Sequence, residues 1–137
     1  MPGNETLTRS VLSGLQSGWQ EKNIAANQTD KKMSLCGCSA IKTQELQRKA
    51  SPISMLVQLS AVITAGTITF YLVVNGAKTN KSVVLNSGSG KKERIKIKPG
   101  KIVLSQGDDI EVWYSTSVDY APTTLEAFVS VEAQWYG

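Results

Sequence analysis

The chain contains no histidine among its 137 residues. Histidine is the side chain that most often acts as a general base near neutral pH, and it is the commonest protein ligand of zinc. The adjacent Asp108 and Asp109 would point to opposite faces of a strand, and a turn that contains them offers too few oxygens for a calcium cage. We expect this Gly-Asp-Asp turn to cap local backbone N–H groups. The sequence therefore predicts no catalytic residue, no cofactor and no metal.

Cysteine is almost as rare, since Cys36 and Cys38 are the only two. One intervening residue is too short for a relaxed disulfide and is not the usual spacing of a zinc knuckle. We expect two free thiols in a reducing cytoplasm. The beginning of the chain has no secretory signal, and the longest apolar stretch, near residues 53–65, is too short and polar to span a bilayer. The sequence thus predicts folding in a cytosol and no membrane partner.

Acidic residues are almost absent between residues 78 and 101, where Glu93 is the single acid. The eight basic residues there are Lys78, Lys81, Lys91, Lys92, Arg94, Lys96, Lys98 and Lys101. From residue 102 onward there is no base, and the six acids are Asp108, Asp109, Glu111, Asp119, Glu126 and Glu132. Such a split is typical of a solvated face, of neutralisation within one sheet or of a contact between subunits.

Because the basic run is short and lacks interleaved aromatics, we do not expect nucleic acid as a partner. We take Lys92, Arg94 and Lys96 as candidate partner contacts.

Residues 1–50 are polar and have few, scattered apolar residues. Leu12, Leu15 and Trp19 belong to a set at helical spacing, which predicts a short amphipathic helix over residues 6–16. The residues that follow show little periodicity. We therefore predict an extended or partly helical arm over residues 1–50 that is ordered by a partner, with a disordered tail as the alternative. Leu12, Leu15 and Trp19 are its candidate partner contacts.

From Pro52 onward, apolar and polar residues alternate with a period of two, which is typical of half-buried strands. The predicted strands cover residues 53–63, 67–74, 82–85, 93–98, 101–104, 110–114 and 124–135. Asn75-Gly76 predicts a tight hairpin turn between the second and third of them. Together these features predict an all-β fold, with a single antiparallel β-sandwich or jelly roll of about seven to eight strands over residues 51–137.

Three aromatic residues, Trp113, Phe128 and Tyr136, fall on the sides of their strands opposite the expected core. Exposed aromatics on a small β-domain mark a contact surface, unless a second sheet or the arm buries both faces. Both readings favour assembly or binding over catalysis. We add Trp113 and Phe128 to the candidate partner contacts.

Three stretches carry a resemblance to a known group of proteins. They are Ile-Thr-Ala-Gly-Thr-Ile-Thr-Phe-Tyr-Leu-Val-Val-Asn-Gly (63–76), Leu-Ser-Gln-Gly-Asp-Asp-Ile-Glu-Val (104–112) and Ala-Pro-Thr-Thr-Leu (121–125). Their order resembles the β-sandwich or jelly-roll modules of tailed-bacteriophage virion accessory proteins, and is similar to head-decoration, fibre and tumour-necrosis-factor-like trimer modules. The resemblance implies an oligomeric virion protein, with a trimer favoured, and it transfers no catalytic or ligand residue.

The leading functional expectation is therefore a non-enzymatic virion structural protein. In its simplest form this is a capsid decoration or cement protein that binds the major capsid protein or another virion protein, assembled in the host cytoplasm. The alternative is a receptor- or glycan-binding module of a phage fibre or spike. A tip module should expose aromatics in loops, whereas Trp113, Phe128 and Trp135 fall within strands, which favours packing. An enzyme inhibitor or nucleic-acid-binding protein is a third reading, and it requires an exposed basic strip over residues 91–101.

Overall fold

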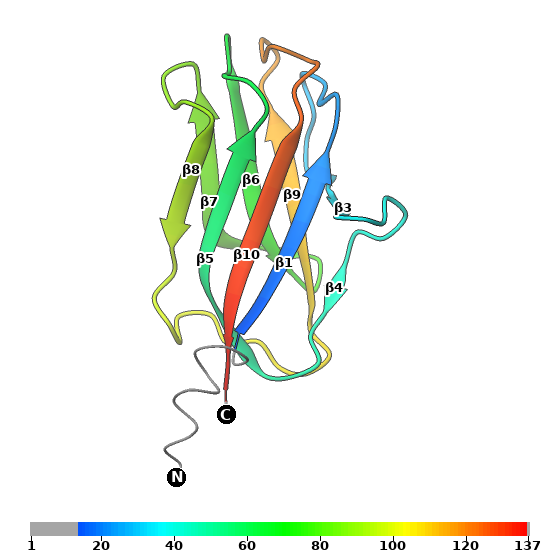
Figure 1. Cartoon of the computed structure of the whole chain (residues 1–137), viewed down its shortest axis with the longest axis vertical. Coiled ribbons are helices and arrows are strands. Elements are labelled where there is room, and N and C mark those ends of the chain that lie inside the picture. The colour runs from blue at the N-terminus through cyan, green and yellow to red at the C-terminus, as the bar shows by residue number, and fades with distance from the viewer. Residues whose placement is uncertain (1–13, 137) are drawn as a thin grey trace.

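The protein consists of β-strands and the loops that join them, as the sequence predicted. The structure is a computed structural model that describes residues 14–136, and for residues 14–16 it describes the backbone alone. None of these residues forms a helix, so none forms one that could cross a membrane. The strands labelled in Figure 1 are β1 (Gly14–Glu21), β2 (Lys31–Lys32), β3 (Ser34–Leu35), β4 (Gln44–Glu45), β5 (Ala50–Leu59), β6 (Thr67–Val74), β7 (Ala77–Asn86), β8 (Lys92–Lys96), β9 (Asp109–Thr116) and β10 (Ala127–Trp135).

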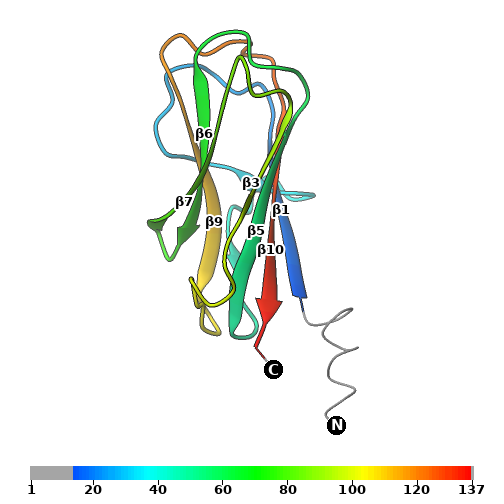
Figure 2. The same cartoon turned by 90° about the vertical axis from the view of Figure 1, so that its left-hand side faces the viewer.

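The strands form two antiparallel sheets that face each other as a β-sandwich (Figure 2). Sheet A has the order β3-β1-β10-β5-β8. Sheet B has the order β2-β9-β6-β7, and β4 pairs with the same edge of β9 as β2. The predicted sandwich is confirmed. The described residues contain more strands than predicted, partly because β2, β3 and β4 are only two residues long.

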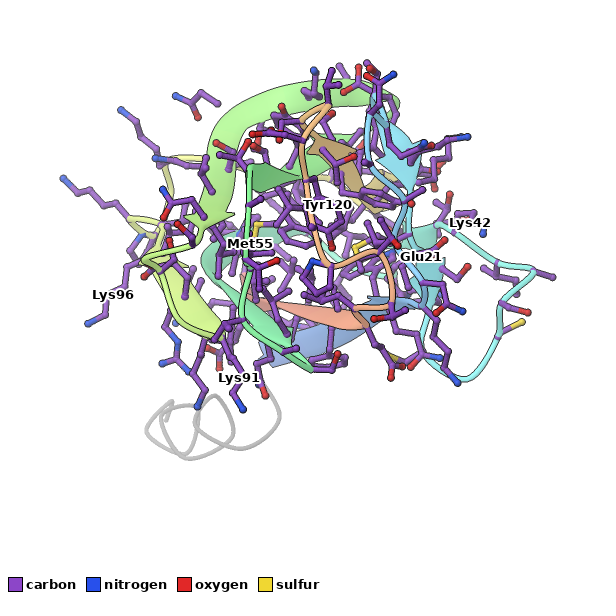
Figure 3. The ribbon with its side chains drawn as sticks, turned by 90° about the horizontal axis from the view of Figure 1, so that it is seen from above. Glu21, Lys42, Met55, Lys91, Lys96 and Tyr120 are labelled. Atoms are coloured by element: carbon purple, nitrogen blue, oxygen red, sulfur yellow. The ribbon has the colours of Figure 1, made fainter. Side chains whose placement is uncertain are left out.

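The core fills the space between the sheets with alternate residues of the long strands. Met55 and Val57 of β5 face Phe70 and Leu72 of β6, and all four are fully buried. Seen along the sandwich, Met55 points between the sheets, whereas Lys96 points away from the body (Figure 3). Burying an apolar side chain of this size stabilises the fold by roughly 1.5–3 kcal/mol. The period of two in the sequence thus reflects one buried and one outer face for each sheet.

The turn at Asn75-Gly76 joins β6 to β7, as predicted. Asn75 has a φ of 50° and Gly76 a φ of 80°, so both central residues have the positive φ that a type I′ turn requires. Val74 pairs directly with Ala77, which means that β7 begins at Ala77 and contains the predicted 82–85 strand. The predicted 101–104 strand is wrong. Leu104 forms only an isolated bridge to Ala50.

The prediction of an arm over residues 1–50 is wrong for its described part. β1 lies inside sheet A between β3 and β10, and it pairs with β10 from Gly14 to Glu21. The predicted helix over residues 6–16 therefore does not include residues 14–16, and residues 1–13 lie outside the described part of the chain. Trp19 is fully buried, and its indole N–H donates a 2.9 Å hydrogen bond to the carbonyl of Lys42. The sandwich thus begins at β1, well before residue 51.

The segment between β1 and β5 closes one side of the sandwich. It pairs with sheet B through β2, crosses to sheet A at β3 and returns to sheet B at β4. Along this path it inserts single apolar residues, Ile24, Met33 and Leu46, into the core. A chain that crosses between sheets contributes one residue at a time, which is why residues 20–50 show no period. The opposite side ends in β7 and β8, each the last strand of its sheet (Figure 1).

Candidate functional site

Lys92, Arg94 and Lys96, which we name the basic strip, lie on the outer face of sheet A along β8. They stand beside Gln58, Leu56 and Ser54 of β5, respectively. All three are exposed, because alternate residues of a strand share one face and this one looks away from sheet B. The structure therefore brings the three predicted basic contacts together in one row.

The basic strip has no acidic partner within the described part of the chain. The ion pairs of residues 14–136 are Lys32 with Glu111 and Lys78 with Asp30. Glu132 lies on β10, which β5 separates from β8, and it accepts a 3.3 Å hydrogen bond from the Ser54 hydroxyl. Among the described residues, the positive charge of the strip is therefore not neutralised by an ion pair.

A shallow groove of about 590 Å³ lies at the end of the basic strip. Ile53, Ile97 and Pro99 supply its apolar lining. Its polar lining comes from Ser54, Arg94, Lys96, Lys98 and Glu132. The groove thus joins apolar surface to the cations of β8.

Phe128 lies on the same outer face as the basic strip. It pairs with Gln58 of β5, and Gln58 pairs with Lys92, so the three side chains form one row across sheet A. The Phe128 ring covers Gly18, where a Cβ atom would lie 2.8 Å from ring atom Cε1 and 3.2 Å from Sγ of Cys36. Gly18 is thus required for close packing of the ring, which still keeps 36% of its surface exposed. The local sequence pattern by itself does not identify this role of Gly18.

Both thiols are exposed, and they form no disulfide with each other. Partial burial near Phe128 raises the pKa of the Cys36 thiol, which keeps it protonated at neutral pH. Such a thiol is a poor nucleophile, because the thiolate is the reactive form.

Trp113 lies on the opposite side of the molecule, on the outer face of sheet B. It pairs directly with Tyr71 of β6, which places the two aromatic side chains next to each other. The indole Nε1–H donates a 2.8 Å hydrogen bond to Oε1 of Glu111. We name Tyr71, Glu111 and Trp113 the aromatic cluster. The structure therefore separates Trp113, which is half-buried, from the exposed candidates, Phe128 and the basic strip.

Glu111 is unusual for an outward-facing residue because only 8% of its surface is exposed. Burial alone would raise the pKa of its carboxyl group, but hydrogen bonds from Thr43 and Trp113, together with the charge of Lys32 at 3.7 Å, lower it. The carboxylate is thus ionised and fully engaged. It fixes the indole ring of Trp113 in place.

Tyr71 is fixed by a second set of charges. The Lys78 ammonium lies 4.4 Å from the centre of the Tyr71 ring and 3.0 Å from Oδ1 of Asp30. Asp30 is in turn bonded to the Ser115 hydroxyl. Sequence reasoning missed Tyr71, although its position between the core residues Phe70 and Leu72 places it on the outer face.

Two predicted contacts of the arm have other locations. Trp19 belongs to the core, so it is not an exposed partner contact. The backbone of Leu15 pairs with Ala133 inside sheet A. Leu12 lies outside the described residues.

A contact between the basic strip of one subunit and the acidic residues of another would require the acids from 108 to 132 to lie on one face. They do not. Glu111 lies on the outer face of sheet B and is paired, whereas Glu132 lies on the outer face of sheet A. Asp108 caps its own turn, as predicted, because Oδ2 accepts the N–H of Ser105 at 2.7 Å. This bond, with a second from Asn75, lowers the Asp108 pKa. The basic strip therefore has no single acidic face to meet on another copy.

Residues 14–136 contain no group of three or more Cys, Asp or Glu side chains that could hold a metal ion. What the described surface offers is two faces for contact, the outer face of sheet A and the aromatic cluster.

No family model and no curated protein matches the chain. A chain of the cyanophage Pam1 capsid asymmetric unit has the same fold, with a TM-score of 0.56 at 12% identity over 90% of this chain and 85% of that chain. A chain of the acidic stable capsid of Helicobacter pylori bacteriophage KHP30 matches with a TM-score of 0.52 at 8% identity, over 88% and 86%. The carbohydrate-binding module CBM36, in complex with calcium and xylotriose, matches with a TM-score of 0.45 at 19% identity, over 88% and 98%. The two capsid matches confirm, at the level of the fold, the β-sandwich that the resemblance to phage virion proteins implied.

Proposed function

We propose that this protein is a non-enzymatic structural component of a phage particle, in the simplest case a capsid decoration or cement protein. The observation that carries the proposal is the outer face of sheet A, where Phe128 and the basic strip are exposed together. An exposed aromatic side chain on the same face as an exposed arginine is a composition typical of protein contact surfaces. The partner is the major capsid protein or another virion protein.

Two further features support this proposal. The chain shares its fold with chains from two phage capsids. Because one fold serves many functions, this supports the proposal only together with the exposed residues of sheet A. The two free strand edges, β7 and β8, lie on one side of the sandwich and suit lateral contacts between copies. In the proposal the protein self-associates, with a trimer favoured, and its location is the assembled virion.

The test uses purified particles that lack the protein and measures how much added protein each particle binds. We expect the double variant Phe128→Ala/Arg94→Glu to lower occupancy strongly, while the variant Trp113→Ala binds normally because it changes the opposite face. Bound protein should also raise the temperature at which the particle releases its nucleic acid. Binding of the double variant at full occupancy, or failure of the unaltered protein to bind any particle, would refute the proposal.

A second candidate function, binding of a receptor or glycan, is favoured by one observation. The Trp113 ring is held by its bond to Glu111 and stands beside Tyr71, so an aromatic platform exists before any ligand arrives. A preorganised site loses less entropy on binding. Binding of host-cell glycans that disappears in Trp113→Ala and persists in Phe128→Ala would favour this function over decoration.

A further inference from the structure

The hydrogen bonds of β8 reveal which of its backbone groups face the free edge of sheet A. The carbonyl of Lys91 accepts from Leu59 at 2.7 Å, and the N–H of Ile97 donates to Ile53 at 2.9 Å. Along an antiparallel strand, the backbone N–H and C=O groups of successive residues point alternately to the strand on one side and to the strand on the other side. Odd-numbered residues of β8 therefore bond to β5, and the N–H and C=O groups of Lys92, Arg94 and Lys96 point to the free edge.

Arg94 supports this assignment directly. Its N–H is bonded to the side chain of the adjacent Glu93, at 3.3 Å, and not to β5. β8 is the last strand of sheet A, and within the described residues it pairs with β5 alone. The residues whose backbone groups point to the free edge are thus the same residues that carry the basic strip, and the Glu93 side chain occupies one of these groups, the N–H of Arg94.

We propose that the free edge of β8 binds an extended acidic segment of a partner protein, which adds to sheet A as one more strand. Residues directly opposite each other in antiparallel strands have their side chains on the same face. A carboxylate at every second position of the segment would therefore stand beside Lys92, Arg94 and Lys96. The inference rests on the proposed function only for the identity of the protein that supplies the segment.

Strand addition supplies affinity through the main chain and specificity through alternate side chains. Lys92, Arg94 and Lys96 together offer about six main-chain hydrogen bonds to an added strand, once the Glu93 side chain releases the N–H of Arg94. The groove lined by Ile53, Ile97 and Pro99 lies on the β5 side of β8, away from the free edge, so an added strand does not reach it. The edge therefore recognises backbone and charge.

The other free edge, β7, is less suited to an acidic segment. Its residue Lys78 is already paired with Asp30 at 3.0 Å and lies over the Tyr71 ring. The cations of β8 have no such partner among the described residues. Charge complementarity therefore favours β8.

Charged side chains on an edge strand also serve to prevent pairing with other chains. The two roles of β8, protection against pairing and docking of an acidic segment, predict different results when an acidic peptide is added. A protective edge leaves its amides free when such a peptide is added, whereas a docking edge binds the peptide and protects them.

The probe is a blocked synthetic peptide of about nine residues that alternates glutamate with valine, long enough to cover β8. Two further versions carry N-methyl groups, one on the glutamate amides and one on the valine amides. With glutamates beside the basic strip, the glutamate amides bond to β8. We expect the first version to lose binding about tenfold or more and the second to bind like the parent peptide.

The protein variant for the test is Arg94→Glu/Lys96→Glu, and its matched control is Lys22→Glu/Lys31→Glu. Each pair of substitutions lowers the formal net charge from +4 to 0, and Lys22 and Lys31 lie away from β8. We expect the first variant to bind the peptide about tenfold or more weakly and the control to keep most of the affinity. Circular dichroism confirms that both are folded.

Amide hydrogen exchange gives a readout that depends on the backbone. In the free protein we expect the amides of Lys92 and Lys96 to exchange faster than those of Glu93 and Ile95. The amide of Arg94, which is bonded to the Glu93 side chain, should exchange at an intermediate rate. Peptide binding should then protect Lys92, Arg94 and Lys96. If both N-methylated versions bind as tightly as the parent peptide, the peptide does not add to β8 as a strand. If the parent peptide does not bind at all, the whole inference is wrong. Since the peptide assay contains no particle, the proposed function is tested separately by occupancy.

Discussion

Trp113 donates its indole N–H to the carboxylate of Glu111, two residues earlier on the outer face of β9, across 2.8 Å. The second carboxylate oxygen of Glu111 accepts the hydroxyl of Thr43 and lies 3.7 Å from the Lys32 ammonium. One carboxylate therefore ties β2 and the residue before β4 to the centre of sheet B.

We expect Glu111→Gln to lower the free energy of unfolding by about 1–3 kcal/mol at pH 7, because hydrogen bonds to a buried charge are lost. The lowered pKa of Glu111 adds a dependence on pH. A carboxyl group of lowered pKa stabilises the fold above its unfolded value of about 4.3, and this stabilisation disappears as the pH falls through the folded pKa. The decrease in unfolding free energy caused by Glu111→Gln should thus be smaller at pH 3 than at pH 7. Urea unfolding at both pH values measures this decrease, with the exposed Glu132→Gln as control. An equal loss at both pH values would contradict the argument.

The turn at Asn75-Gly76 provides a test of backbone strain. Gly76 has a φ of 80°, and a Cβ atom there would meet nothing within 4 Å, so any cost of a substitution comes from the backbone alone. We expect Gly76→Val to cost about 1–3 kcal/mol, because a β-branched residue avoids positive φ. Gly76→Asn should cost clearly less, since asparagine tolerates this conformation. Thermal unfolding of both variants measures the difference, and equal stability would mean that the turn has another conformation.

Tyr120 is 2% exposed, and its hydroxyl has no hydrogen-bond partner among the described residues. A buried polar group without a partner costs about 1–3 kcal/mol, so we expect Tyr120→Phe to stabilise the protein by about 1 kcal/mol. The control is Tyr71→Phe, which should change stability little. A destabilised Tyr120→Phe variant would mean that the hydroxyl does have a partner.

The same residue predicts a dependence on alkaline pH. Burial, followed by the charge of Tyr114, raises the pKa of Tyr120 to about 12. The unfolded chain releases this proton near pH 10, whereas the folded chain keeps it, so stability falls as the pH rises from about 10 to about 12. Chemical unfolding at pH 9 and pH 11 should show a smaller fall for Tyr120→Phe than for the unaltered protein. An identical fall in both proteins would exclude Tyr120 as the cause.

Deletion of residues 2–30 should abolish folding, because it removes β1 from the middle of sheet A and Trp19 from the core. Removing a buried tryptophan side chain alone costs about 3–5 kcal/mol, a large part of the stability of a small domain. Deletion of residues 2–12 keeps every described strand and is the matched control. Near-ultraviolet circular dichroism and thermal melting compare the two. A cooperative transition in the longer deletion would contradict the position of β1.

The features that sequence alone determined are local ones. Alternation from Pro52 onward predicted the strands from β5 to β10, though not β1, because a half-buried strand needs one apolar and one polar face. Asn75-Gly76 gave the hairpin, because few residues accept positive φ at two successive positions. The same alternation placed Lys92, Arg94 and Lys96 on one face, as the structure confirms.

Only the tertiary structure decided how distant segments meet. Ile24 and Met33 are core residues, although their neighbours show no period, because the chain there crosses between two sheets. Trp19 is a core residue because β1 pairs with β10, more than 100 residues later in the chain. Glu111 is bonded to Thr43, 68 residues away along the chain, so its burial on an outer face leaves no trace in the local pattern. The free edge of β8 likewise follows from the order of strands in sheet A. Which side of a strand remains unpaired depends on its neighbours in the sheet, and those neighbours are chosen by long-range packing.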